Sequence, residues 1–166
     1  STTHFTLSIE SRLTSIEAQY EVSLLRGVTQ NHPPQIKATF TNTSDSQRQF
    51  MFGSKAPLSP QASDSPEPKF HLRTPPSDGT YEADGCWRSP SNAWLSNATT
   101  ATLQPGESIS NRLDVLAAPN ITGDRYCLPK GKSTFINKVP EYAPTSAGDL
   151  GDKVGEGTLR FALTVK

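Results

Sequence analysis

The chain has 166 residues, and its 16 Lys and Arg are balanced by 16 Asp and Glu, so the formal net charge is zero. This length is typical of one compact domain, and we expect residues 1–166 to share a single core. The balanced charge argues against a nucleic-acid-binding protein and against a polybasic membrane-surface protein, because both need a basic surface. No apolar run approaches the ~18 residues of a membrane span.

Alternating apolar residues dominate the chain, and helical spacing is nearly absent. Residues 12–18 form the one segment where a short helix is arguable. The alternation predicts strands, in chain order, at residues 5–9, 20–24, 36–40, 50–52, 70–72, 81–87, 99–103, 109–115, 133–136 and 159–165. A count of about nine strands separated by turns predicts an all-β antiparallel sandwich or barrel.

Proline and glycine mark the connections between these strands. Residues 104–107 read Gln-Pro-Gly-Glu, which predicts a tight turn with Gly106 at the position that tolerates positive φ. Residues 54–69 carry four prolines, and residues 140–157 carry two prolines and four glycines. We expect both segments to be long loops, because proline weakens a strand and long loops often carry binding sites.

Two cysteines and three glycosylation sequons point to an extracellular protein. Cys86 and Cys127 are an even pair in a chain rich in Ser and Thr, which fits one disulfide; two separate buried thiols are the alternative. Such a bridge would stabilise the fold by about 4 kcal/mol in the chain-entropy model. The sequons place candidate glycosylation sites at Asn42, Asn97 and Asn120. We therefore expect an extracellular or cell-surface location.

The sequence contains no recognisable catalytic constellation. His4, His32 and His71 are widely spaced, and no zinc-protease, nucleophile-elbow or phosphate-loop motif occurs. Either Cys86 or Cys127 together with His71 is the one candidate for a nucleophile and its base, and a disulfide would occupy both thiols. We expect no enzymatic activity and no cofactor.

Two groups of residues are weaker candidates for ligand binding. Asp149, Asp152 and Glu156 lie in a Gly-rich segment and could supply oxygen ligands to Ca²⁺, although their spacing also suits a solvated loop. Trp87 and Trp94 could form a binding surface for a sugar or a protein partner. For Trp87 the alternative is core packing against the disulfide, whereas Trp94 is surrounded by turn-forming residues.

Three segments carry a family resemblance. They read Ala-Thr-Phe-Thr-Asn-Thr-Ser at residues 38–44, Leu-Gln-Pro-Gly-Glu-Ser at 103–108 and Tyr-Cys-Leu-Pro-Lys-Gly-Lys-Ser-Thr-Phe at 126–135. Together they resemble the bacterial and archaeal extracellular immunoglobulin-like sandwiches, including the intracellular proteinase inhibitor-type domain. The resemblance implies an immunoglobulin-like antiparallel β-sandwich of about nine strands with two long loops, and a fold alone supplies no function.

The chain departs from antibody domains in its cysteine neighbourhood. Its two cysteines are too close in sequence, Trp87 adjoins Cys86, and Tyr126 adjoins Cys127 instead of preceding it by two residues. The tyrosine-corner and core-disulfide roles of antibody domains are therefore not carried over to these residues.

The function expected from these features is that of a non-catalytic structural or interaction module. Residues 1–11 could complete the sheet of a neighbouring copy through Phe5, Leu7 and Ile9 and so build a filament, and an ordinary first strand is the alternative. A protease inhibitor acting through residues 54–69 or 126–132 and a carbohydrate-binding module are further alternatives. The expected partners are other protein subunits, either self or a surface partner, and glycans.

Overall fold

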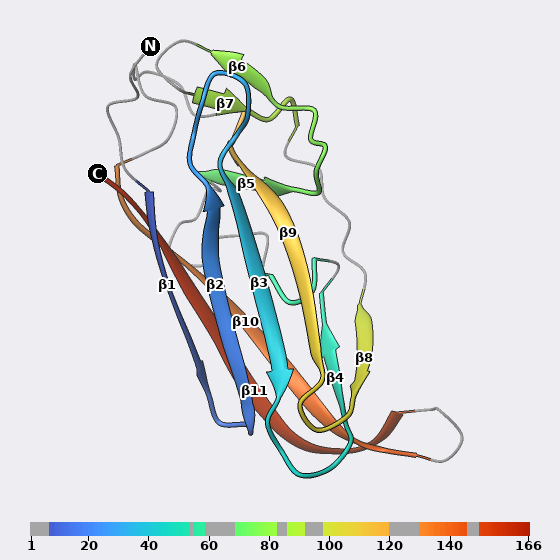
Figure 1. Cartoon of the computed structure of the whole chain (residues 1–166). Coiled ribbons are helices and arrows are strands. Elements are labelled where there is room, and N and C mark those ends of the chain that lie inside the picture. Colours follow the sequence, from blue (N-terminus) through green and yellow to red (C-terminus); the bar gives the residue numbers. More distant parts are fainter. Residues whose placement is uncertain are drawn as a thin grey trace.

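The computed structural model describes residues 7–53, 55–58, 69–82, 86–91, 98–119, 130–145 and 150–166 (Figure 1). Its strands are β1 (Leu7–Thr14), β2 (Ala18–Arg26), β3 (Gln35–Asn42), β4 (Arg48–Phe52), β5 (Phe70–Arg73), β6 (Thr80–Glu82), β7 (Cys86–Arg88), β8 (Thr99–Leu103), β9 (Ser108–Ala117), β10 (Gly131–Pro144) and β11 (Leu150–Val165). Within these ranges the chain is all-β. The described segments contain no helix long and apolar enough to cross a membrane.

Two sheets pack against each other (Figure 1). The first has the strand order β1-β11-β10-β4-β8; the second has the order β2-β3-β9-β7-β6, and β5 also pairs with β9. All pairs are antiparallel except the short contact between β7 and β9. The predicted all-β, two-sheet architecture is confirmed. The strand count rises above nine partly because the segment predicted as one strand at residues 81–87 contributes to two antiparallel strands, β6 and β7.

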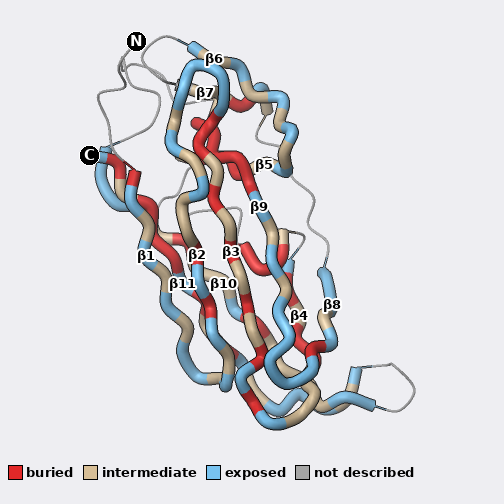
Figure 2. Tube along the Cα trace, viewed as in Figure 1, coloured by how far each residue is buried: buried red, intermediate tan, exposed pale blue. Residues whose placement is uncertain are grey.

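The core lies between the two sheets, where one face of each strand is buried. On β3, Ile36, Ala38 and Phe40 are all fully buried, whereas the residues between them face outward. This is the period-two pattern of a sheet with one solvated face. The Phe135 and Phe161 rings stack at 4.5 Å between centroids. Buried residues of both sheets join one cluster, and Figure 2 shows them along the strands.

Residues 12–18 do not form the short helix that the sequence left open. They comprise the end of β1, a turn at residues 15–17 and the start of β2. Leu13 continues the apolar alternation of β1 and packs partly buried against the core. Ser15 reverses the chain with a φ of 77°, a left-handed conformation that non-glycine residues adopt rarely.

The prediction of a loop over residues 140–157 is wrong in the described part of that segment. Strands β10 and β11 form a hairpin whose ladder runs from Gly131 opposite Val165 to Pro144 opposite Leu150. The ladder between β10 and β4 comprises only two residue pairs, so Pro140 and Pro144 lie where the other edge of β10 forms no ladder. Proline is tolerated at such an edge because it has no N–H to contribute. Most of the predicted 54–69 loop lies outside the described residues.

Two of the segments that carry the family resemblance meet at one end of the sandwich. The Asn42 amide nitrogen donates to the carbonyl oxygens of Ser46 at 3.0 Å and Leu103 at 2.9 Å. The backbone N–H of Asn42 donates to Glu107 O at 3.0 Å, and Gly106 N–H donates to Asn42 O at 2.7 Å. Gly106 has a φ of 81°, as the predicted turn requires.

This hydrogen bonding corrects one glycosylation candidate. The Asn42 side chain is fully buried, and its amide nitrogen already makes two hydrogen bonds. A glycan on that nitrogen is incompatible with the folded position, because the sugar would need both the space and the donor. Asn42 therefore has a structural role in this fold.

Candidate functional site

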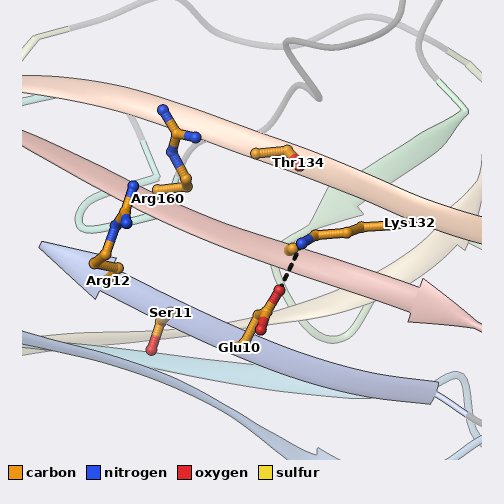
Figure 3. Close-up of a pocket in the computed structure, with 7 residues that line it drawn as sticks. Glu10, Ser11, Arg12, Lys132, Thr134 and Arg160 are labelled. Carbon is orange, nitrogen blue, oxygen red and sulfur yellow. Dashed lines mark ion pairs between the residues drawn. The ribbon is translucent and has the colours of Figure 1, made fainter.

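The outer face of the first sheet carries a depression flanked by cationic side chains. Its open volume is about 410 Å³, and it spans the neighbouring strands β1, β11 and β10. We name it the basic depression and define it by the residues Glu10, Arg12, Lys132, Thr134, Arg160 and Ala162. Figure 3 shows Arg12 and Arg160 at one side of it and Lys132 with Glu10 at the other.

The register of the three strands creates the depression. Glu10 of β1 and Thr134 of β10 flank Ala162 of β11, because the three residues are opposite one another in the ladders. Alanine is short, so the floor between the longer side chains stays low. Ser11 lies on the same strand but points to the other side, where its hydroxyl accepts a hydrogen bond from Val22 N–H at 3.0 Å (Figure 3).

Two arginines stand directly opposite each other beside this floor. Arg12 of β1 is the cross-strand partner of Arg160 of β11, and both side chains are exposed. Neither guanidinium has an ion-pair partner among the described residues. Directly opposed like charges destabilise a sheet, so the pair is a cost to the fold unless an anion neutralises it.

Glu10 and Lys132 form an ion pair across the floor. Their charged atoms lie 2.7 Å apart, and both side chains are largely exposed. The hydrogen bond from Lys132, with its positive charge, holds the pKa of Glu10 below the ordinary glutamate value. The depression therefore contains three cations and one carboxylate, a net charge of two positive units that suits an anionic ligand.

Removing the Glu10 charge is expected to tighten anion binding severalfold. In Glu10→Gln the Lys132 ammonium is released from its partner and becomes available to the ligand. In the native chain the same effect should appear as the pH falls below the ordinary glutamate pKa of 4.5, because the lowered pKa keeps Glu10 charged above that range. Binding of dextran sulfate, whose sulfate esters stay ionised, would be measured by calorimetry across this pH range.

The control for that experiment is Glu21→Gln, which removes the same charge from the exposed face of β2 in the other sheet. This variant should keep native affinity at neutral pH and the native rise at low pH. Equal gains in the Glu10 and Glu21 variants would show that only overall charge matters.

A second depression lies near Trp87 at the other sheet. Trp87 is half-buried and does not belong to the core cluster, and its packing against a disulfide stays a prediction because Cys127 lies outside the described residues. Its indole N–H donates to Thr29 O at 2.7 Å, and its ring meets Tyr81 edge-on at 5.5 Å. Pro75, Pro76 and the buried Asp114 help to line this depression.

A buried Ser–His pair has a hydrogen-bond direction that does not suit catalysis. His71 Nδ1 and Ser89 Oγ lie 2.7 Å apart, and Ser89 Oγ donates to Ser91 O at 2.8 Å. A carbonyl can only accept, so the hydroxyl proton points to Ser91 and His71 Nδ1 donates to Ser89. Activating a serine nucleophile needs the opposite direction. The pair joins β5 to the segment after β7.

Several residues singled out in the sequence fall outside the described ranges: Phe5, Trp94, Asn97, Asn120, Cys127 and Asp149. The disulfide stays a prediction because neither Cys127 nor the side chain of Cys86 is described. No group of three potential metal ligands occurs among the described residues. Glu156 lies on β11, paired with Lys153 at 3.0 Å and Lys138 at 3.9 Å.

Leu7 and Ile9 belong to β1, which pairs with β11 of the same chain. Leu7 is buried and Ile9 packs partly buried against the core. The ordinary first-strand interpretation therefore describes the conformation seen here, and exchange between copies stays a proposal.

Sequence reasoning did not find the basic depression. Arg12 falls in the segment left open as a helix, Arg160 falls on the solvent face of the predicted strand at residues 159–165, and Lys132 falls in the turn before the predicted strand at 133–136. The alternation does place Arg160 opposite the core, but strand order is needed to bring Arg12 beside it. Comparison with protein-family models, with curated proteins and with solved structures finds no match.

Proposed function

We propose that this chain is a non-catalytic, immunoglobulin-like interaction module of an extracellular or cell-surface protein, and that its basic depression binds an acidic polysaccharide. The observation that carries the proposal is the cross-strand pair of Arg12 and Arg160 beside the low floor at Ala162. Guanidinium groups hydrogen-bond to the oxygens of sulfate and carboxylate groups through a planar fork. The opposed charges lower stability without a ligand, and they flank the low floor at Ala162, whereas the opposed Lys37 and Arg112 lie on the other sheet away from this depression.

The surroundings of the depression favour a saccharide over a protein partner. The same outer face carries the hydroxyl side chains of Ser8, Thr14, Thr134, Thr158 and Thr164. Hydroxyl groups can exchange hydrogen bonds with sugar hydroxyls. A protein interface needs an apolar centre, and the large exposed apolar side chains among the described residues, Leu25, Leu150 and Val154, lie away from this depression.

Binding of the polysaccharide is expected to depend on both arginines. Arg12→Gln and Arg160→Gln should each weaken dextran sulfate binding about fivefold, and the double variant should weaken it more than tenfold. Each single variant should unfold at the same or a higher urea concentration than the native chain, because a like-charge contact has been removed. Calorimetry and urea unfolding measure the two effects.

The matched control is Arg112→Gln on β9. Arg112 is exposed and faces Lys37 across the outer face of the second sheet, so it is also one of two opposed cations. Arg112 does not line the basic depression. Native affinity in this variant is expected, and a loss equal to that of the Arg12 variant would contradict a localised site.

Two further arms test the shape of the site and the chemistry of the ligand. Ala162→Leu keeps every charge but fills the floor, so a loss of affinity would tie binding to the depression itself. A polyuronate in place of dextran sulfate asks whether carboxylates serve as well as sulfates, and neutral dextran should not bind. Binding of neutral dextran with unchanged affinity would refute the anionic site.

A further inference from the structure

Strand β1 is held at the edge of the first sheet by one neighbour. It pairs with β11 over eight residues, from Leu7 opposite Val165 to Thr14 opposite Thr158. No described strand pairs with its outer edge. Leu7 is the only residue of β1 that is buried. Releasing β1 therefore breaks one ladder and withdraws Leu7, Ile9 and Leu13 from the core, while the edge of β11 becomes free to accept an identical strand that restores both.

The connection from β1 to β2 is short and holds an unfavourable backbone conformation. It consists of residues 15–17, and Ser15 has a φ of 77°. Non-glycine residues lose free energy in this region, and an extended connection would release that strain. One contact opposes the extension of this connection, because Ile16 packs closely over Gly157. A Cβ added to Gly157 would lie 2.5 Å from the Ile16 methyl carbon Cδ1.

We propose that β1 exchanges between two copies of this chain, so that each basic depression is completed by Glu10 and Arg12 of the partner copy. The partner's strand makes the same ladder and the same core contacts, so the exchanged dimer loses only contacts of the connecting residues 15–17, such as Ile16 over Gly157, and relieves the strain at Ser15. The polysaccharide site then spans two chains, because Lys132, Thr134 and Arg160 stay with the original copy. This composite site rests on the proposed function, but the exchange itself does not.

Bound anion favours neither the closed monomer nor the exchanged dimer, because the depression is the same in both. It does favour the docked state of β1 over the released state, since it bridges Arg12 and Arg160 across the ladder. The ligand is therefore expected to slow exchange between copies without changing the final proportion of dimer.

The first test uses Ser15 and needs no ligand. Proline fixes φ near −65°, so Ser15→Pro is incompatible with the closed turn and should give a dimer by light scattering. Glycine accepts a φ of 77°, so Ser15→Gly should give a monomer at the same protein concentration. The native chain should become increasingly dimeric as its concentration rises. Monomers for the native chain and the proline variant at millimolar concentration would overturn the proposal.

The second test is complementation between Arg12→Gln and Arg160→Gln, and it decides the question even if the proline variant does not fold. The two variants are refolded together, and the control sample is refolded separately and mixed just before measurement. Random exchange restores about a quarter of the depressions to native composition in the co-refolded sample. Calorimetry with dextran sulfate should detect these high-affinity sites only there. Equal binding in both samples, with a dimer present, would mean that the copies associate by another route.

Failure of the proposed function has a different signature. If the native chain does not bind dextran sulfate, the complementation test has no binding signal to measure. The molar masses of the native chain and the two Ser15 variants by light scattering still decide whether β1 exchanges. Binding by a chain that is monomeric throughout would retain the polysaccharide site and overturn the exchange.

Discussion

Replacing Phe40 by alanine is expected to lower the free energy of unfolding by about 4 kcal/mol. Phe40 is fully buried, and its ring meets Phe50 at 4.8 Å and Phe52 at 5.1 Å in edge-on arrangements. These partners lie on β4 in the opposite sheet, so the substitution opens a cavity where the two layers touch. Urea unfolding monitored by fluorescence would measure the loss as a lower midpoint with an unchanged slope.

Two comparisons make this prediction specific. Phe40→Leu retains most of the apolar volume and should cost about 1–2 kcal/mol. Val154→Ala changes an exposed side chain on β11 and should alter stability by less than about 0.5 kcal/mol. A Phe40→Ala chain as stable as the Val154 variant would mean that the two sheets do not pack through this ring.

Replacing Asn42 by alanine should cost about 3 kcal/mol, because the buried Leu103 carbonyl oxygen loses its donor and the Ser44 N–H and hydroxyl lose the Asn42 Oδ1 that accepts from them. Asn42→Asp keeps the shape but places a carboxyl oxygen against carbonyl oxygens. Burial and this contact raise the pKa of the new carboxyl, so the folded state holds a proton that the unfolded chain releases.

The pH dependence follows from that proton. A raised pKa in the folded state means that stability is present at low pH and declines as the pH rises through and above the ordinary aspartate value of about 3.9. The Asn42→Asp chain should therefore lose stability between acidic and neutral pH relative to the native chain. Asn31→Ala, at an exposed loop position, is the control and should match the native chain. A flat difference across pH would show that the carboxyl is solvated.

Local sequence signals were sufficient where they belong to one strand or one turn. Residues 99–103 were predicted as a strand and coincide with β8, and Ile36, Ala38 and Phe40 occupy the buried face that their alternation indicates. The turn at residues 104–107 has its glycine at positive φ. These features depend on the alternation of side chains between the two faces of a strand and on the backbone preferences of proline and glycine. Both act over a few residues.

The same signals failed where a distant strand overrides local preference. Pro140 and Pro144 suggested a loop, but β11 pairs with β10 from Gly131 to Pro144, and on the other edge only Glu141 and Tyr142 pair with β4, so neither proline belongs to that ladder. Residues 12–18 left a short helix arguable between two predicted strands. Pairing of Leu13 opposite Leu159 extends β1 instead, and Ser15 then turns the chain toward β2.

The alternation of apolar residues predicted the all-β class and the buried face of strands such as β3, and proline and glycine predicted the tight turn at residues 104–107. Strand order, in contrast, became visible in the folded chain: β1 lies beside β11, which places Arg12 opposite Arg160 and the short Ala162 between Glu10 and Thr134. The reason is the range of the forces involved. Alternation is a property of neighbouring residues, whereas strand order and register depend on burying the faces of both sheets at once.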